Sequence, residues 1–276
     1  MQNSIKIGFI GAGNMAYALI SGLINNGFNA QNIKLSDTDA ALLSQRQAEF
    51  SLEVFTDNIK LANQCDVIVL AIKPQTLSVV CKELQAHIDH QPLIISIAAG
   101  VRATDINRWL GGNTAIVRTM PNTPALLGEG ATGMMANDVV SDEQKALAEQ
   151  ILGAVSQCLW VEDEKILDAV TALSGSGPAY FFLMIESMTK SGVALGLDEK
   201  TAEQLSIQTA LGASMMASSS EYSAHELRAK VTSPNGTTQA AIESFQNQNF
   251  EMVVSHAMRA GFDRARKMGA ELGDDD

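Results

Sequence analysis

Short apolar runs recur through the first half of the chain, and stretches with helical spacing of apolar residues separate them. Residues 66–72 and 93–97, for example, are mostly Val, Ile, Leu and Ala. A strand that helices cover on both faces reads as such a run, whereas a strand with one wet face alternates. The pattern therefore predicts a parallel sheet with helices on both sides. The expected strands are residues 6–10, 33–36, 52–55, 66–72, 93–97, 115–118 and 133–136, and the expected helices are 15–26, 40–49, 75–87 and 104–110.

The pattern changes near Glu162. From Lys165 to Met268 the apolar spacing is helical, and no convincing strand is present. The sequence predicts helices at residues 177–195, 197–218, 225–230, 238–246 and 250–268. We therefore expect an α/β chain of two domains, with an N-terminal Rossmann-type parallel sheet at residues 1–162 and an all-helical dimerisation domain at residues 163–276.

Composition narrows the class of protein. The chain has 276 residues, of which 46% are hydrophobic and 18% charged, and its net charge is −12. This charge argues against partners such as nucleic acid or an anionic membrane surface. Cys65, Cys81 and Cys158 share no metal-ligand spacing, and no run approaches the ~20 apolar residues of a membrane helix. We expect a cytoplasmic protein that binds neither a metal nor a membrane.

Residues 7–16 form an apolar run that ends in the spacing G-x-G-x-x-A. Gly11 would make a tight turn, Gly13 would let a phosphate approach the backbone, and the following helix would point its N-terminus at a pyrophosphate. The alternative is a strand–helix turn without a ligand. Because the motif lies between a predicted strand and a predicted helix, we expect it to bind NADPH or NADH through Gly11, Gly13, Asn14 and Met15.

Two later segments follow predicted strands, and ligands bind beyond the carboxyl ends of the strands in open α/β sheets. Residues 71–74 should therefore border the cofactor, although they could simply end a strand. Residues 98–100 are small enough for a flat nicotinamide ring to lie close to the backbone. The expected cofactor residues here are Ala71, Lys73, Pro74, Ala98, Ala99 and Gly100.

Residues 231–238, with the sequence Val-Thr-Ser-Pro-Asn-Gly-Thr-Thr, precede a predicted helix. They combine hydroxyl donors, backbone N–H groups and a helix N-terminus, which together favour an anion site. An ordinary N-cap is the alternative, but a cap needs only one such residue. The four histidines are scattered and adjoin no nucleophile motif. We therefore expect the chemistry to be hydride transfer from the cofactor.

Five motifs occur in order along essentially the whole chain. The most specific are Asp-Ala-Val-Thr-Ala-Leu-Ser-Gly-Ser-Gly-Pro-Ala-Tyr at 168–180 and Thr-Ser-Pro-Asn-Gly-Thr-Thr at 232–238; the others lie at 8–16, 71–74 and 120–124. Together they closely resemble the pyrroline-5-carboxylate reductase family.

The resemblance implies reduction of (S)-1-pyrroline-5-carboxylate to L-proline by NADPH or NADH, the last step of proline biosynthesis. It also implies that the Thr238 hydroxyl meets the ring nitrogen of the substrate, while backbone N–H groups hold the carboxylate. A protonated imine accepts hydride without a strong general acid, which agrees with the lack of a catalytic histidine. The implied substrate residues are Glu221, Ser233, Gly236, Thr237 and Thr238, and the implied further cofactor contacts are Asn58 and Glu164.

Two positions depart from the family pattern. Asn235 stands where many members have glycine, but Asn tolerates positive φ better than most residues. Asp37 lies at the end of the second predicted strand, where an acidic residue usually holds the ribose 2′-hydroxyl of NAD and would repel a 2′-phosphate. Ser36 and Thr38 could still hydrogen-bond a phosphate. We therefore expect Ser36 and Asp37 in the cofactor site, with a bias toward NADH or at least acceptance of both cofactors.

The helices expected at 177–195 and 197–218 are apolar over much of their faces. Such helices must be buried, and a domain of this length cannot easily bury two of them alone. We expect an obligate homodimer, and the resemblance implies the same, with larger homo-oligomers of dimers in some members. Two other functions stay open: another imine or β-hydroxyacid reductase on the same two-domain plan, and a cofactor-sensing protein without turnover.

Overall fold

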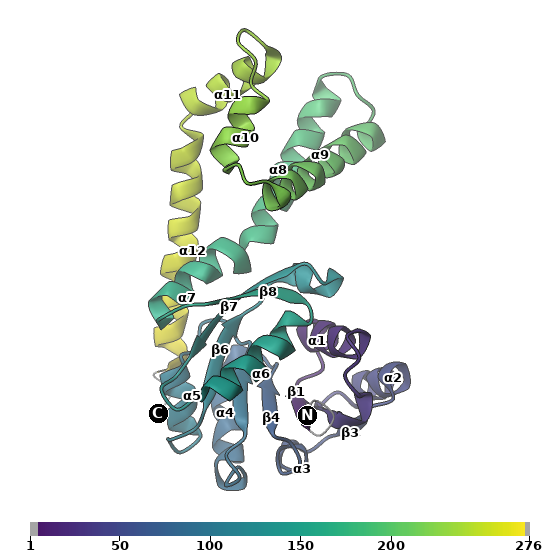
Figure 1. Ribbon diagram of the computed structural model, residues 1–276, viewed down its shortest axis with the longest axis vertical. Coiled ribbons are helices and arrows are strands. Elements are labelled where there is room, and N and C mark those ends of the chain that lie inside the picture. Colours follow the sequence, from purple (N-terminus) through teal and green to yellow (C-terminus); the bar gives the residue numbers. More distant parts are fainter. Residues whose placement is uncertain (1–4, 274–276) are drawn as a thin grey trace. The chain divides into compact units, whose positions relative to one another are not determined.

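An eight-stranded sheet organises the first half of the protein in the computed structural model, which describes residues 5–273 (Figure 1). The strand order is β3-β2-β1-β4-β5-β6-β7-β8. β1 to β6 are parallel, whereas β7 is antiparallel to β6 and parallel to β8. The strands are β1 (Ile7–Ile10), β2 (Ile33–Ser36), β3 (Glu53–Phe55), β4 (Val67–Leu70), β5 (Leu93–Ser96), β6 (Ile116–Met120), β7 (Gly130–Ala136) and β8 (Ser156–Trp160).

The predicted parallel sheet is confirmed for β1 to β6, and the antiparallel pairing of β6 with β7 is a departure from it that the sequence did not predict. Residues 121–129 connect the two strands and contain only the short 3-10 helix η3 (Thr123–Leu127). A parallel neighbour needs a crossover of a dozen or more residues, so this short connection reverses the chain direction. The sequence analysis did not assign β8, whose apolar residues Cys158, Leu159 and Trp160 lie in a largely exposed edge strand and not in a run buried on both faces.

The alternation of side chains across the sheet explains the continuous apolar runs. Val67 and Val69 of β4 belong to the hydrophobic core on one face of the sheet, while Ile68 and Leu70 belong to the core on the other face. β5 divides in the same way. Successive residues of a strand point to opposite faces, so a strand with two buried faces needs apolar residues at every position. The predicted burial of both faces is therefore confirmed.

Helices fill both layers. The sequence predicted α1 (Asn14–Asn25), α2 (Ala40–Phe50), α4 (Pro74–Leu84) and α5 (Ala103–Trp109) to within a few residues. It did not predict the short α3 (Asn58–Ala62) or α6 (Asp142–Gly153). For α7 (Glu164–Val170) it gave helical spacing from Lys165 onward but no separate helix. α6 begins at a capping box in which the side chain of Ser141 accepts the Gln144 N–H group.

The chain divides into two compact units. The first unit contains the residues up to Ser176 together with those from Gly261 onward, and the second unit is Gly177–Ala260. The predicted domain boundary lies earlier, between residues 162 and 163. The first unit extends further because α7 lies against β7 and because the end of α12 (Phe250–Gly273) packs on the sheet domain.

Small residues allow the close approach of α12 to the sheet domain. Ala265, Gly269 and Gly273 are the buried residues of this helix, and they are spaced four residues apart on one face. A Cβ atom on Gly269 would lie 2.9 Å from the carbonyl oxygen of Gly100. The Arg108 guanidinium donates a hydrogen bond to the carbonyl oxygen of Gly273.

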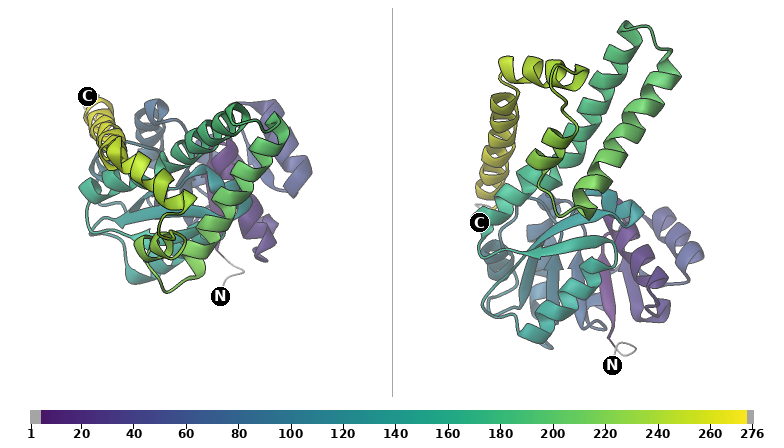
Figure 2. Two further views of the ribbon diagram at one scale, coloured as in Figure 1. Left: turned by 90° about the horizontal axis from the view of Figure 1, so that it is seen from above. Right: turned by 45° about the horizontal axis from the view of Figure 1, so that its top comes forward.

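The second unit is entirely helical in its described residues. α8 (Gly177–Ala194) and α9 (Glu199–Ser219) lie side by side, as the right-hand view of Figure 2 shows, and α10 (Ala224–Lys230) and α11 (Thr237–Asn247) follow. Burial is scarce: Gly177 in α8 and Ala202 and Ser206 in α9 are buried, whereas no residue of α10 or α11 is.

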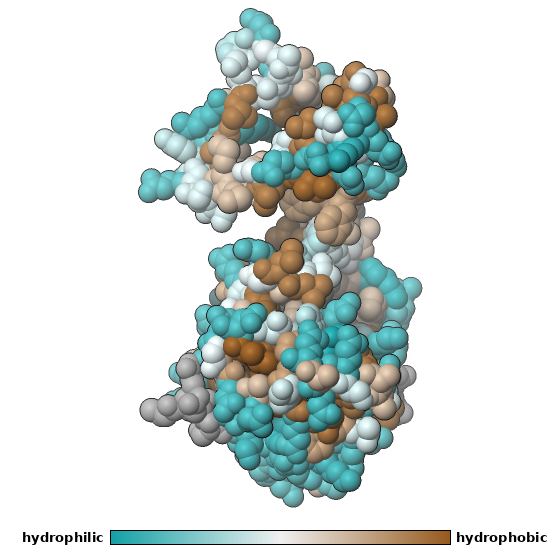
Figure 3. Space-filling view, turned by 90° about the vertical axis from the view of Figure 1, so that its right-hand side faces the viewer, coloured by the Kyte–Doolittle hydropathy of each residue, from teal (hydrophilic) through white to brown (hydrophobic). Residues whose placement is uncertain are grey.

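Many large apolar side chains of the second unit are exposed in the single chain, and Figure 3 shows hydrophobic residues on its surface. They include Phe181, Phe182, Leu183, Leu205, Leu211, Met215 and Met216. An exposed apolar surface of this kind marks a site of contact with another protein or a membrane.

One helical stretch, Glu164–Ala194, is long and apolar enough, by length and composition only, to cross a membrane, although Ser174, Ser176 and Glu186 interrupt its apolar residues. Its most apolar window has a mean hydropathy of 1.2. The stretch begins, however, with Glu164 and Asp168, which form ion pairs with Arg118 of the sheet domain. Its first turns therefore belong to the folded first unit.

Candidate functional site

Gly11 makes the tight turn after β1 that the sequence predicts. Its φ angle is +103°, and its N–H group donates to the carbonyl oxygen of Ser36 at 2.8 Å. A Cβ atom at this position would lie 2.3 Å from the carbonyl oxygen of Ala71. Only glycine fits both the dihedral angle and the space, so Gly11 joins the carboxyl ends of β1, β2 and β4.

Gly13 has a different environment. It is the N-cap of α1, its φ angle is −65°, and no heavy atom lies within 4 Å of the place where its Cβ would be. No side chain caps this helix, so the N–H groups of Asn14 and Met15, its first two residues, have neither a cap nor an intrahelical partner. Open space next to free N–H groups at a helix N-terminus is suited to a phosphate.

Side-chain caps are common in the described part of the chain, which makes their absence at particular helices informative. α2, α3, α6, α7, α9 and α10 all have an Asp or Ser that accepts an N–H group of the first turn. In contrast, α1, α4, α5 and α11 have no side-chain cap at the N-cap residue. Three of these four, α1, α4 and α11, begin in the predicted cofactor and substrate segments.

The end of β2 is fastened to the glycine loop. One carboxylate oxygen of Asp37 accepts the Ala12 N–H group at 2.7 Å, and the other accepts the Asp39 N–H group at 2.9 Å. The Ser36 hydroxyl donates to the side-chain oxygen of Asn58 at 2.7 Å. The structure thus brings Ser36, Asp37 and Asn58 together beside Gly11.

A cavity of about 390 Å³ lies at these residues. Its walls come from the glycine turn, the end of β2, the start of α3 and one side of α4. The residues that line it are Ile10, Gly11, Ser36, Asp37, Thr38, Asn58, Ile72, Gln75, Thr76, Val79, Val80 and Glu83. Its position at the carboxyl ends of parallel strands is where an α/β sheet binds a dinucleotide.

The segments after β4 and β5 are positioned differently from each other. The Ala71 N–H group donates to the carbonyl oxygen of Ile10 at 2.8 Å, Lys73 is the exposed N-cap of α4, and Pro74 is its first residue. After β5, Ala98 is buried in the core, Ala99 is half-buried, and Gly100, with φ +80°, lies against Met268.

Glu164 makes contacts that the sequence did not reveal. Its carboxylate accepts the Ala103 N–H group at the start of α5 and lies 3.6 Å from the guanidinium of the buried Arg118. Asp168 lies 3.2 Å from the same guanidinium. This cluster anchors α7 to β6 and α5. The contact of Glu164 with the cofactor stays a prediction. The sequence did hold one sign of the cluster, because Arg118 is a charged residue within the apolar strand predicted at 115–118.

The motif at 120–124 is bonded to the motif at 168–180. The Asn122 amide donates to the carbonyl oxygen of Ser174 at 3.0 Å, and its oxygen accepts the Ala131 N–H group at 2.9 Å. Ser174 belongs to η4 (Thr171–Gly175), a π-helical turn between α7 and α8. A Cβ atom on Gly175 would lie 2.5 Å from the methyl group of Met120. The buried Asn122 therefore fixes the π-helical turn, a role that the sequence alone does not suggest.

The segment 231–238 lies in the second unit. Asn235 has φ +59°, as its tolerance of positive φ predicts, and its N–H group donates to the Gln239 side chain at 2.7 Å. The Gly236 N–H group donates to the carbonyl oxygen of Ser233 at 3.0 Å. Gly236 is the N-cap of α11, so Thr237 and Thr238 are its first residues and their N–H groups have no side-chain cap.

The predicted substrate residues are therefore unequal in their surroundings. Ser233 and Thr237 are exposed, while Thr238 is half-buried. The Gln239 amide donates in turn to Glu243 at 2.7 Å, a contact that braces the turn and that the sequence did not predict. Glu221 is exposed in the connection between α9 and α10, just before the Ser223 cap.

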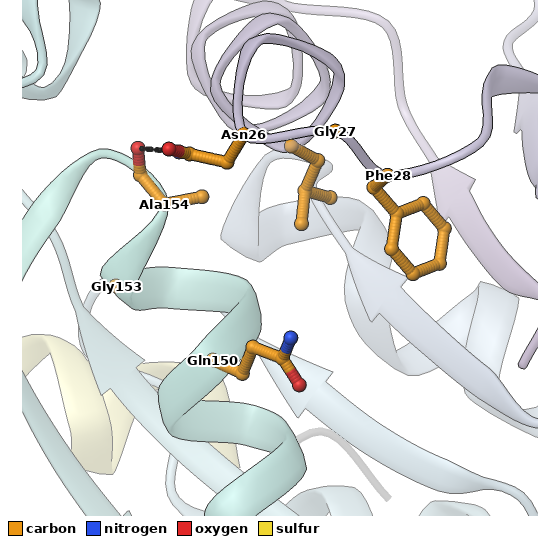
Figure 4. Close-up of a pocket in the computed structure, with 7 residues that line it drawn as sticks. Asn26, Gly27, Phe28, Gln150, Gly153 and Ala154 are labelled. Carbon is orange, nitrogen blue, oxygen red and sulfur yellow. Dashed lines mark hydrogen bonds between the residues drawn. The ribbon is translucent and has the colours of Figure 1, made fainter. Parts of the chain in front are cut away.

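Another cavity, of about 350 Å³, lies between the ends of α1 and α6 (Figure 4). Asn26 donates there to the carbonyl oxygen of Ala154, and Phe28 and Gln150 lie on its walls. Its lining has neither a titratable side chain nor a predicted site residue. Within residues 5–273, no group of three or more His, Cys, Asp or Glu side chains is placed to hold a metal ion.

Comparison with known proteins agrees with this geometry. Residues 164–268 match the family model for pyrroline-5-carboxylate reductase dimerisation, and residues 6–100 match the model for coenzyme F420-dependent NADP oxidoreductase. The pyrroline-5-carboxylate reductase of Pseudomonas aeruginosa is 48% identical over 97% of this chain and 98% of its own length. The reductase of Arabidopsis thaliana is 36% identical over 96% of each chain.

Solved structures give the same result. A pyrroline-5-carboxylate reductase from Coxiella burnetii has a TM-score of 0.93 at 41% identity, covering 96% of this chain and 99% of that one. The Plasmodium falciparum enzyme, solved with NADP bound, has a TM-score of 0.86 at 30% identity, covering 98% of this chain and 100% of that one. With full-length identity of this size to several such enzymes, the chain belongs to the pyrroline-5-carboxylate reductase family.

Proposed function

We propose that this protein reduces (S)-1-pyrroline-5-carboxylate to L-proline with NADH or NADPH, the last step of proline biosynthesis, in the cytoplasm. The observation that carries the proposal is the uncapped N-terminus of α11, which follows the positive-φ turn at Asn235 and starts with two threonines. Free N–H groups and hydroxyls at a helix N-terminus bind a small carboxylate. Family membership and the dinucleotide fold support the same reaction.

The substrate segment has distinct donors for the two polar parts of the substrate. The N–H groups of Asn235 and Gly236 are already used within the turn. The N–H groups of Thr237 and Thr238, with the Ser233 hydroxyl nearby in sequence, would then hold the carboxylate. The Thr238 hydroxyl would hydrogen-bond to the ring nitrogen of the protonated imine, whose carbon accepts the hydride to give the neutral ring amine. The proposed set of substrate residues also includes Glu221 and Gly236, the N-cap of α11, which has no side chain to block the helix N-terminus.

The reduced nicotinamide supplies the hydride when the dinucleotide is bound. The first unit would hold the pyrophosphate at Gly11, Gly13, Asn14 and Met15, where a Cβ on Gly13 would occupy the open space. Ser36, Asp37 and Asn58 line the cavity for the ribose. The remaining proposed cofactor contacts are Ala71, Lys73, Pro74, Ala98, Ala99, Gly100 and Glu164.

The family model assigns a dimerisation domain to residues 164–268. We propose that residues 163–276 act as one functional domain, and that two copies of the chain bury the exposed apolar faces of α8 and α9 against each other. Assembly of such dimers into a larger homo-oligomer is part of the same proposal. The large apolar side chains that α8 and α9 expose in the single chain support the dimer, because contact of such a surface with water is unfavourable in free energy.

The test is oxidation of NADH and NADPH, followed by absorbance, with pyrroline-5-carboxylate and with β-hydroxyacids as separate substrates. Turnover with pyrroline-5-carboxylate and formation of L-proline are expected. Turnover only with β-hydroxyacids would instead identify a related reductase. Binding of the dinucleotide without turnover of either substrate would identify a cofactor-sensing protein and contradict the proposal.

A further inference from the structure

The dinucleotide cavity has two carboxylates on its walls. Asp37 at the end of β2 and Glu83 on α4 are its acidic residues, and neither Lys nor Arg is among the described residues that line it. Sites for NADP usually provide an Arg for the 2′-phosphate, whereas sites for NAD provide an Asp or Glu for the ribose 2′-hydroxyl. The charges on the cavity walls are therefore those of a site for NAD.

Asp37 has a fixed position and a structural task as well. Its two carboxylate oxygens accept the N–H groups of Ala12 and Asp39, so its negative charge is held beside the glycine loop. Replacement of Asp37 by a neutral residue would remove this charge and also loosen the loop. A change in cofactor preference after such a replacement would have two causes that activity measurements could not separate.

Glu83 has no such second task. Thr76, Val79, Val80 and Glu83 lie at positions i, i+3, i+4 and i+7 of α4, which places them on one side of the helix, and this side lines the cavity. Glu83 is exposed, and none of the ion pairs in the described part of the chain neutralises it. Its charge therefore acts on whatever occupies the cavity without holding the backbone in place.

We infer that this cavity selects a dinucleotide with a free 2′-hydroxyl, NADH over NADPH, and that Glu83 is a determinant of this selection. The inference rests on the proposed function only for the class of cofactor. A 2′-phosphate would bring about −1.5 to −2 charges near neutral pH into a cavity with two carboxylates and no cation on its lining. Like charges repel most strongly where protein walls displace water.

The test is equilibrium binding of NADH and NADPH to the full chain, measured by nicotinamide fluorescence for the wild type, Glu83→Gln and Glu83→Lys. Asp138→Asn removes one exposed charge elsewhere in the first unit and serves as the control. Adenosine 2′,5′-bisphosphate and ADP, used as competitors, show whether an effect resides at the 2′ position. Circular dichroism confirms that each variant is folded.

The wild type should bind NADH more tightly than NADPH. Glu83→Gln should raise the affinity for NADPH relative to NADH roughly threefold, and Glu83→Lys roughly tenfold, as expected for removing and then reversing one nearby charge. Asp138→Asn should leave the ratio unchanged. Tighter binding of NADPH by the wild type, or an unchanged ratio in Glu83→Lys, would overturn the inference. Turnover of pyrroline-5-carboxylate is measured separately, so failure of the proposed function is a different result.

Discussion

The two glycines of the dinucleotide loop should respond differently to the same substitution. In Gly11→Ala, the methyl group would lie 2.3 Å from the carbonyl oxygen of Ala71, whose N–H group is held by Ile10 at 2.8 Å. The φ angle of +103° adds strain for any residue other than glycine. Backbone strain and overpacking each cost about 1–3 kcal/mol, so we expect a loss of about 2–6 kcal/mol in the free energy of unfolding.

Gly13→Ala should leave stability intact. The φ angle of Gly13 is −65°, and no heavy atom lies within 4 Å of the added methyl group. A Gly→Ala change at a compatible position gains about 0.4–1 kcal/mol because it restricts the unfolded chain, and the weaker preference of alanine for the N-cap position opposes this gain. The methyl group would instead occupy the place of the phosphate, so we expect the affinity for NADH to fall at least about tenfold, which is about 1.4 kcal/mol.

Thermal melting without ligand and titration with NADH separate the two effects. Gly11→Ala should lower the melting temperature by at least about 4 °C, since a chain of this size loses about 2–4 °C per kcal/mol. Gly13→Ala should melt at or slightly above the wild-type temperature and bind NADH weakly. The reasoning would be refuted if Gly13→Ala melted below Gly11→Ala, or if it bound NADH as tightly as the wild type.

Four further outcomes are expected. Thr238→Ala should lower kcat/KM for pyrroline-5-carboxylate about 10- to 100-fold, the value of a lost hydrogen bond to a charged group, and near wild-type kinetics would disprove its role. Gln239→Leu removes the acceptor of the Asn235 N–H group, so KM for pyrroline-5-carboxylate should rise several-fold while KM for NADH stays constant; a rise in both would argue against a role confined to the turn. Phe182→Asp on the exposed face of α8 should reduce the mass seen by light scattering together with activity, and an active monomer at micromolar concentration would contradict the dimer. Burial raises the pKa of the Cys81 thiol from 9.0 to about 12, so between these pH values the folded chain keeps a thiol proton that the unfolded chain loses. The contribution of this thiol to the free energy of unfolding should be complete below pH 9 and should fall by about 1.4 kcal/mol per pH unit from pH 9 to 12. Denaturant midpoints should therefore fall less steeply over this pH range in Cys81→Ala than in the wild type, and equal slopes would refute the reasoning.

The sequence predicted the strands that helices cover on both faces of the sheet. Alternate residues of β4 lie in the two hydrophobic cores, so every position of this strand must be apolar, and the sequence shows this as a continuous apolar run. β8 carries no such signal, because it is an edge strand defined by its pairing with β7. α6 had a local signal in its capping box, Ser141 with Gln144, but its mixed composition gives no strong apolar period. Pairing partners and edges are properties of the tertiary structure.

In the candidate site, too, the features that depend on adjacent residues were predictable, and those that depend on distant partners were not. The positive φ angles of Gly11 and Asn235 depend on adjacent residues, and both could be predicted from the residue types. The bond from Asn122 to Ser174 and the cluster around Arg118 join residues far apart in the chain. Such partners are brought together only by the fold, so spacing rules have no access to them. Local motifs therefore pointed to the segments proposed to bind ligands, whereas the contacts that hold those segments in place emerged from the structure.

The distribution of helix caps connects fold to function in this chain. A side-chain cap satisfies N–H groups at a helix N-terminus and stabilises the helix by about 1 kcal/mol. Six helices have such a cap, whereas α1, α4, α5 and α11 have none. Of these four, α1 and α11 follow Gly13 and Gly236, which have no side chain to offer. The chain therefore forgoes stability at the two termini where the cofactor and substrate motifs lie. A bound phosphate or carboxylate would make the missing hydrogen bonds, so each ligand would complete a helix that the sequence leaves open.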